Sequence, residues 1–324
     1  MARRPFWQQL TSARGWSGSL LAAVLAGALV ACGGGGSSPA STTPGNGGTD
    51  PLQQEPGAPV MTGNTAVDGA NWINYRRQQV GVGALARNAK LDAAAQGHSD
   101  YLRINNTITH TQTAGQPGFT GATLGDRLGN AGYAVVRPFA YGEVISATSS
   151  TSGFYQAEEL VGAIYHRFVM FEPLFREIGT GAASSTSGYT YFTADMATSA
   201  GYGTSVGRGK VVVYPFNNQT KVPLNFLSDN ESPDPVPGQN EVGYPVSVHV
   251  DITSVLAVQS FTIKPHGGAA LTVRQVDNAS AGDPPSAAAI IPLSVLAAGT
   301  VYDVSFSGTV DGVAVSRSWS FTTK

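Results

Sequence analysis

The chain has 324 residues and a formal net charge of −2, with 42% hydrophobic and only 12% charged residues. This length suits two domains of average size, and the apolar content is sufficient for a core in each. The small net charge offers no electrostatic basis for nucleic-acid binding, so we expect no nucleic-acid partner.

The N-terminus resembles a bacterial lipoprotein signal. Arginines precede an apolar run, SLLAAVLAGALVA (19–31), which is too short to cross a bilayer as a mature helix but suits a secretory signal. The run leads into LVAC (29–32), where Cys32, the single cysteine, stands at the first mature position and excludes an intramolecular disulfide. The resemblance implies removal of residues 1–31 and acylation of Cys32, with a lipid membrane as partner. The alternative is an ordinary secretory signal with an incidental cysteine.

Gly33 follows Cys32, and no aspartate stands there to indicate retention at the inner membrane. We therefore expect a lipid-anchored protein of the cell envelope, at the outer membrane or cell surface. Residues 32–67 are dominated by Gly, Ser, Pro and Thr, which cannot bury enough apolar area to offset chain entropy. They are predicted to form a flexible linker.

The next region, residues 68–199, mixes helical patterns with strand patterns. One helix is predicted within each of the stretches 71–85, 88–106, 123–133 and 157–170. The second has one apolar face formed by Leu91, Ala94, Ala95, His98 and Leu102. Gly81, Gly132 and Pro173 are expected to end the first, third and fourth helices. Residues 190–198 alternate as a strand, and the absence of a regular βαβ rhythm favours α+β packing.

From residue 209 to 324 the pattern becomes one of short strands separated by turn signals, which predicts an all-β sandwich. Asp311-Gly312 between two alternating runs predicts a hairpin. The expected core is Tyr302, Val304, Phe306, Trp319 and Phe321. The acidic residues of DNESPDP (229–235) stand beside prolines in a predicted loop without the spacing of a calcium site. This region resembles the Ig-like and fibronectin-like modules of bacterial surface proteins.

Three residues of the first region have types suited to chemistry, and one of them, His110, lies where packing does not require a histidine. His110 follows the second helix, Glu143 opens an apolar run, and His166 lies in the fourth helix. Two histidines with carboxylates can bind a divalent metal such as zinc, through His110 and His166, or act as general acid and base. Their spacing matches no compact local metal motif, so spacing alone does not bring them together.

Other polar residues have structural interpretations. His98 is expected to be a hydrogen-bonded core residue, and Arg127 to form an ion pair inside the domain. Glu172 and Glu177 are expected to serve structure. GTSVG (203–207) matches G-x-S-x-G but lies in a glycine-rich connector, so we reject a nucleophile elbow there.

The order of motifs from NYRRQQVGVGAL through HT, DRLGNAGY, GEV and YHRF to FREIGTG resembles the CAP superfamily, the cysteine-rich secretory, antigen 5 and pathogenesis-related proteins, in its disulfide-free bacterial form. The resemblance implies an α-β-α sandwich whose cleft is lined by two histidines and two acidic residues and holds zinc in some members. His110, Glu143 and His166 match three of these. Glu158 and Glu159 are both candidates for the second acid, and we include Glu159 with the cleft residues.

Three functions remain open at this point. The first is non-enzymatic binding, through the CAP cleft, of a small apolar or lipid-like ligand or of an envelope partner. The second is a metal-assisted hydrolase using His110, Glu143 and His166. The third is a structural surface or adhesion protein. We expect the first, because no nucleophile is evident and the acidic set is incomplete.

Overall fold

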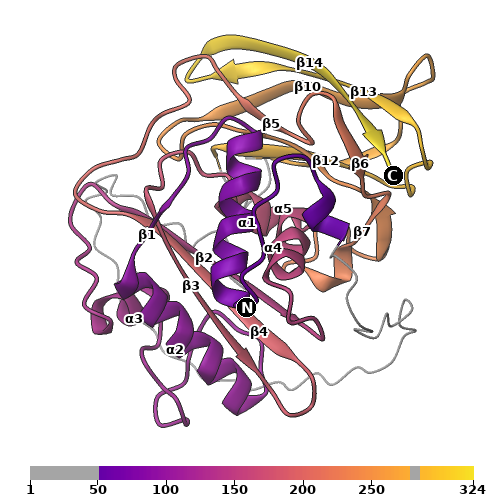
Figure 1. The fold of residues 1–324 in the computed structure, drawn as a ribbon. Helices are drawn as coiled ribbons and strands as arrows, with labels where there is room; N and C mark the ends of the chain where they lie inside the picture. Colours follow the sequence, from indigo (N-terminus) through magenta and orange to yellow (C-terminus); the bar gives the residue numbers. More distant parts are fainter. Residues whose placement is uncertain (1–50, 278–284) are drawn as a thin grey trace.

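The structure is a computed structural model that describes residues 51–277 and 285–324 (Figure 1). The signal peptide and Cys32 lie outside these residues. The predicted linker, 32–67, extends too far, because its last part is ordered: residues Pro51–Gln54 form a 3-10 helix (η2) and the next helix begins at Thr65. Glu55 anchors this part, since its carboxylate accepts bonds of 2.7 and 2.8 Å from the guanidinium of Arg76.

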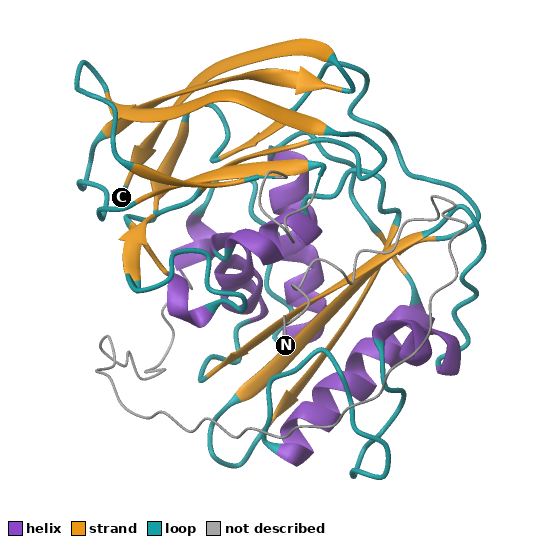
Figure 2. Ribbon diagram, turned by 180° about the vertical axis from the view of Figure 1, so that it is seen from behind, coloured by secondary structure: helices purple, strands orange, loops and turns teal. Residues whose placement is uncertain are grey.

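The N-terminal domain is a four-stranded sheet with helices on both faces (Figures 1 and 2). Its elements are α1 (Thr65–Gln79), β1 (Ala86–Arg87), α2 (Ala89–Asn105), α3 (Leu124–Asn130), β2 (Ala140–Thr148), α4 (Gly153–Gly162), α5 (Ile164–Met170), β3 (Glu177–Ser184) and β4 (Thr190–Thr198). The strand order is β1-β3-β4-β2, with β1 parallel to β3 and the other pairs antiparallel. The α+β class expected from the sequence is confirmed.

Glycines allow helices to lie directly on the sheet. A Cβ at Gly179 would fall 2.0 Å from the carbonyl carbon of Leu91, and one at Gly181 would fall 2.3 Å from the backbone of Gln96. Helix α2 therefore covers one face of β3 at backbone contact distance. On the opposite face, a Cβ at Gly69 of α1 would fall 2.4 Å from the ring of Phe192. The result is the helix–sheet–helix layering that the resemblance implied.

The single helix predicted over 157–170 is wrong, because the structure has two. Helix α4 ends at Gly162, Ala163 is extended with ψ 122°, and α5 begins at Ile164. No side chain of the adjoining segment caps α5. Its first N–H groups instead donate to the carboxylate of Glu231, a residue of the C-terminal domain. Helix α5 ends at Met170, three residues before Pro173, so the helix ends close to the position expected from the sequence.

The C-terminal domain consists of two four-stranded sheets and a short strand pair (Figure 2). Its strands are β5 (Val212–Tyr214), β6 (Gln219–Val222), β7 (Asn225–Leu227), β8 (Glu241–Gly243), β9 (Val246–His249), β10 (Leu256–Pro265), β11 (Val273–Val276), β12 (Ala287–Pro292), β13 (Val301–Val310) and β14 (Val313–Thr323). The sheet orders are β10-β13-β14-β6 and β11-β12-β9-β5, with β7 paired to β8. A 3-10 turn, η3 (Ser228–Asn230), follows β7.

Two expectations for this domain are confirmed. Asp311 and Gly312, with φ of 49° and 77°, form the two-residue turn between β13 and β14. The predicted core residues, Tyr302 to Phe321, are all at most 6% exposed. The G-x-S-x-G segment lies in the connector before β5, where Ser205 donates to the carboxylate of Asp251, so it forms no nucleophile elbow.

The two domains pack together through α5 and the turn that follows it. The buried Arg167 donates to Pro245 O at 2.7 Å and to Ser247 Oγ at 3.2 Å. Its guanidinium carbon lies 4.8 Å from the ring centre of Tyr214 on β5. Ile252 N–H donates to Glu172 at 3.1 Å. One hydrophobic cluster contains buried residues of both domains, so the cleft and the β-domain belong to one packed body.

Candidate binding cleft

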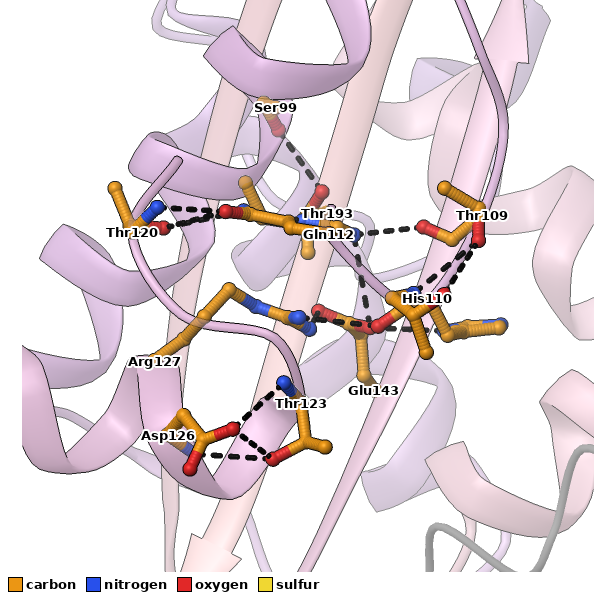
Figure 3. Close-up of polar contacts among 12 residues, drawn as sticks. Ser99, Thr109, His110, Gln112, Thr120, Thr123, Asp126, Arg127, Glu143 and Thr193 are labelled. Carbon is orange, nitrogen blue, oxygen red and sulfur yellow. Dashed lines mark hydrogen bonds and ion pairs between the residues drawn. The ribbon is translucent and has the colours of Figure 1, made fainter. Parts of the chain in front are cut away.

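Glu143 on β2 is the central acid of the candidate site, which we call the cleft after the family resemblance, and both of its oxygens are engaged (Figure 3). Oε2 accepts Arg127 Nη2 at 2.6 Å, and Oε1 pairs with His110 Nδ1 at 2.8 Å. The side chains of Glu143 and Arg127 are both fully buried. Burial alone would raise the pKa of Glu143, but the positive charge of Arg127 and the nearby His98 and His110 hold it well below its usual range. Glu143 is therefore a permanent carboxylate.

The loop that carries His110 is fixed by two buried side chains. His98 Nε2 donates to Thr109 O at 2.8 Å, while its Nδ1 accepts from Gln112 Nε2 at 2.9 Å. Arg127 Nη1 donates to His110 O at 3.0 Å. Burial lowers the pKa of His98 to about 4, so this ring is neutral and acts as a hydrogen-bonded core residue, as expected from the sequence.

His110 itself is neutral and oriented. Its side chain is 21% exposed, and burial lowers the pKa of its ring in spite of the hydrogen bond with Glu143. A neutral ring facing a carboxylate holds its proton on Nδ1 and donates it to Glu143. His166 acts on the pKa of His110 electrostatically, which places the two histidines in one neighbourhood.

Asp195 is an acid of this site that sequence reasoning missed. It lies opposite Glu143 in the β2–β4 pair, and residues directly opposite share a face of the sheet. Among the described residues no donor hydrogen-bonds either of its carboxyl oxygens. Burial and the negative charge of Glu143 raise the pKa of Asp195 well above its usual value, so Asp195 is the protonated acid of the two. One arginine thus balances one charged acid rather than two.

His166 on α5 pairs with an acid of the C-terminal domain rather than with Glu143. Its Nδ1 lies 3.0 Å from Oε1 of Glu231, whose side chain is 1% exposed. Glu231 follows η3 in the DNESPDP segment, which the sequence had predicted to be a loop without a site. Sequence reasoning did not single out Glu231, whose carboxylate reaches His166 from the C-terminal domain.

The two adjacent glutamates of α4 have different surroundings. Glu158 accepts Trp72 Nε1 and Arg76 Nε, both at 2.7 Å, and so connects α4 to α1. Glu159 accepts Ser146 Oγ of β2 at 3.1 Å. Glu159 is exposed, yet desolvation by its surroundings raises its pKa against the opposing effects of Ser146 and His166. Of the two, Glu159 is the one that lies beside a cleft histidine.

The comparison with family models agrees with this architecture. Residues 70–196 match the model of the cysteine-rich secretory protein family, CAP. These residues are a CAP domain. The chain is also similar to an extracellular protein containing an SCP domain from Bacillus anthracis, at 23% identity and a TM-score of 0.35, covering 41% of this chain and 39% of that one. The chain is similar to an outer surface protein of Borrelia burgdorferi as well, at 15% identity and a TM-score of 0.34, covering 40% of this chain and 89% of that one. No curated protein matched the chain.

The polar groups of the CAP cleft fit a zinc ion only in part. Each cleft histidine presents Nδ1 to a carboxylate, as metal-ligating imidazoles commonly do. However, the described residues contain no group of three or more His, Cys, Asp and Glu side chains arranged to hold a metal. Zinc sites in proteins usually have three or four protein ligands. Zinc at His110 and His166 thus stays a prediction.

No helix within residues 51–277 and 285–324 has the length and apolar content required to cross a membrane.

Proposed function

We propose that this chain is a lipid-anchored protein of the cell envelope whose CAP cleft binds a small apolar or lipid-like ligand without chemical turnover. The signal-like N-terminus and Cys32 support the anchoring, the outer membrane or cell surface being the proposed location. The proposal of binding rather than catalysis is supported by how the polar groups of the cleft are used.

The observation that carries the proposal is the double engagement of Glu143. A general base must take up a proton near the working pH, and a carboxylate whose pKa lies well below the usual range is a weak base. His110 uses Nδ1 to face Glu143, and burial further lowers its pKa. The network therefore holds the loop of His110 in place instead of supplying a reactive group.

Apolar side chains near this loop favour an apolar ligand. Ile108, two residues before His110, is 64% exposed, and Ile104 and Phe119 are 45% and 39% exposed. A Cβ at Gly118 would lie 3.2 Å from Cδ1 of Ile104, so the segment before Phe119 contacts the end of α2. Exposed apolar groups of this size, at the end of α2 and on the loop beside it, offer contact area to an acyl chain.

Lipid retention by the purified protein tests the proposal. A Cys32→Ser variant, in which no acyl chain can be attached, is incubated with vesicles of phosphatidylethanolamine and phosphatidylglycerol, re-isolated, and analysed by mass spectrometry. We expect bound lipid, and a loss of it in Ile108→Glu. Val301→Glu is the matched control, because Val301 is an exposed apolar residue of the β-domain, at 40%. Protein recovered without lipid would contradict the proposal.

The hydrolase is the alternative function, and the carboxylate–histidine pairs are the observation that favours it. It predicts turnover of a peptide, ester or glycan substrate that His110→Ala and His166→Ala abolish while the fold is retained. A broad substrate panel with no turnover excludes it. If neither lipid retention nor turnover is found, the structural or adhesion function is the remaining one.

A further inference from the structure

The side chain of Glu231 makes four hydrogen bonds, and all four go to the start of α5. Oε2 accepts Ile164 N–H at 2.9 Å. Oε1 accepts Tyr165 N–H at 2.6 Å, His166 N–H at 3.2 Å and lies 3.0 Å from His166 Nδ1. Both oxygens are therefore used, and a single carboxylate satisfies three backbone donors and one ring nitrogen.

This contact crosses the domain boundary. Glu231 belongs to the segment between β7 and β8 of the C-terminal domain, whereas α5 belongs to the CAP domain. The N-cap residue of α5, Ala163, has no side chain that could accept these bonds, so the capping acceptor comes from the other domain. The break between α4 and α5 frees the same N–H groups that Glu231 binds.

Glu231 also binds the ring of His166. A neutral imidazole that faces a carboxylate through Nδ1 carries its proton there and is an acceptor at Nε2. Because the backbone of His166 is held by the same carboxylate, both the position and the proton of the ring depend on Glu231. His110 has the corresponding arrangement with Glu143, but entirely within the CAP domain.

We propose that Glu231 is a positioning residue of the CAP cleft, so that the C-terminal domain completes the site by orienting His166. This inference rests on the proposed function only for its ligand readout. The orientation itself is measurable without a ligand. Glu159, which lies near His166 on α4, bonds to Ser146 and leaves the orienting contact to Glu231.

The tautomer of His166 tests the proposal in the full chain. Nitrogen-15 NMR of the histidine rings, assigned with His166→Gln and recorded in alkaline buffer, is expected to show the proton of the His166 ring on Nδ1, the nitrogen that faces Glu231. In Glu231→Ala this proton should exchange rapidly and the ring should shift toward the Nε2–H tautomer. Glu231→Gln retains one oxygen acceptor and should restore the wild-type tautomer. The His110 ring is the internal control, and Glu241→Gln, an exposed acid that binds Asn225, is the matched one.

Lipid retention gives the second readout, with the same vesicles and the Cys32→Ser background. Glu231→Ala should lower retained lipid about fivefold, the factor for one ordinary hydrogen bond, as should His166→Ala. If Glu231→Ala changes the tautomer of His166 but retains as much lipid as the wild type, the role of Glu231 in the cleft is overturned. A His166 ring that is Nε2–H in the wild type overturns the positioning, even if the alanine variant does not fold. If Glu231→Ala changes the tautomer of His166 and even the wild-type protein retains no lipid, the positioning by Glu231 stands and the proposed function is refuted.

Discussion

Glu172, at the contact between the two domains, carries a pH dependence that the substitution Glu172→Gln should remove. It is 3% exposed, and its Oε1 accepts Leu174 N–H at 2.9 Å and Ile252 N–H at 3.1 Å. Burial raises the pKa of this carboxyl from 4.5 to about 8, with Asp251 adding to the effect and the two N–H groups opposing it. At neutral pH the folded protein therefore keeps a proton that the unfolded chain releases.

The sign and size of the effect follow from proton linkage. Because the pKa is higher in the folded state, the stability from this group is complete below about pH 4.5 and is lost as the pH rises toward about 8. Each pH unit within that window costs about 1.4 kcal/mol, so the free energy of unfolding falls by about 3 kcal/mol by pH 7. Glutamine resembles the protonated acid in shape, keeps an oxygen for the two N–H donors, and has no proton to lose.

Urea unfolding at pH 4, 5.5, 7 and 8.5 measures this prediction. We expect Glu172→Gln to match the wild type at pH 4 and to exceed its free energy of unfolding by about 3 kcal/mol at pH 7. Glu241→Gln, at an exposed position, should show no such trend. A difference between Glu172→Gln and the wild type that stays constant with pH would refute the assignment of a raised pKa to Glu172.

Three further predictions concern the cleft and the sheet beneath it. Arg127→Met leaves the buried Glu143 without its cation and should lower the free energy of unfolding in urea by about 3–5 kcal/mol. Calorimetric titration with zinc should show weak binding that is lost in both His110→Ala and His166→Ala; binding that survives both variants would exclude these ligands. Gly179→Ala places a Cβ against the backbone of α2 and should cost about 3 kcal/mol, measured by urea unfolding.

Matched variants show whether these losses of stability come from the buried positions or from any substitution of an arginine or a glycine. Arg87 forms a partly exposed pair with Asp92, so Arg87→Met should cost about 1 kcal/mol or less. Gly129 lies in α3 with open space around its Cβ position, and Gly129→Ala should stabilise the protein by about 0.5–1 kcal/mol. Equal losses within either pair would contradict the reasoning from burial and close approach.

Local patterns were sufficient where neighbouring residues determine the structure. The apolar face of α2 was readable because Leu91, Ala94 and Leu102 recur at helical spacing, and all three are buried. The turn at Asp311 and Gly312 was readable because few residues adopt positive φ at both positions of a two-residue loop. Such features depend on contacts within a few residues, which a sequence displays directly.

The break at Ala163 and the acid at Asp195 depend on partners distant in the sequence. Glu231 lies 65 residues after His166, and nothing in the DNESPDP segment shows that its acid will reach another domain. Asp195 did leave a signal, since an acid in the middle of an apolar strand pattern requires a partner. That partner becomes visible only when the register places Asp195 opposite Glu143.

The two histidine–carboxylate pairs differ in how their acids are compensated, and this difference links the cleft to the packing of the domains. Glu143 is balanced by Arg127, so the first pair is complete within the CAP domain. Glu231 has backbone N–H groups of α5 in place of a guanidinium, so its compensation exists only while the domains are packed. Separating the domains would leave both the N–H groups and the ring of His166 without this acceptor. Packing of the domains therefore strengthens the binding of any ligand that requires the oriented ring. Because such coupling is reciprocal, binding of that ligand must stabilise the packing of the domains by the same free energy.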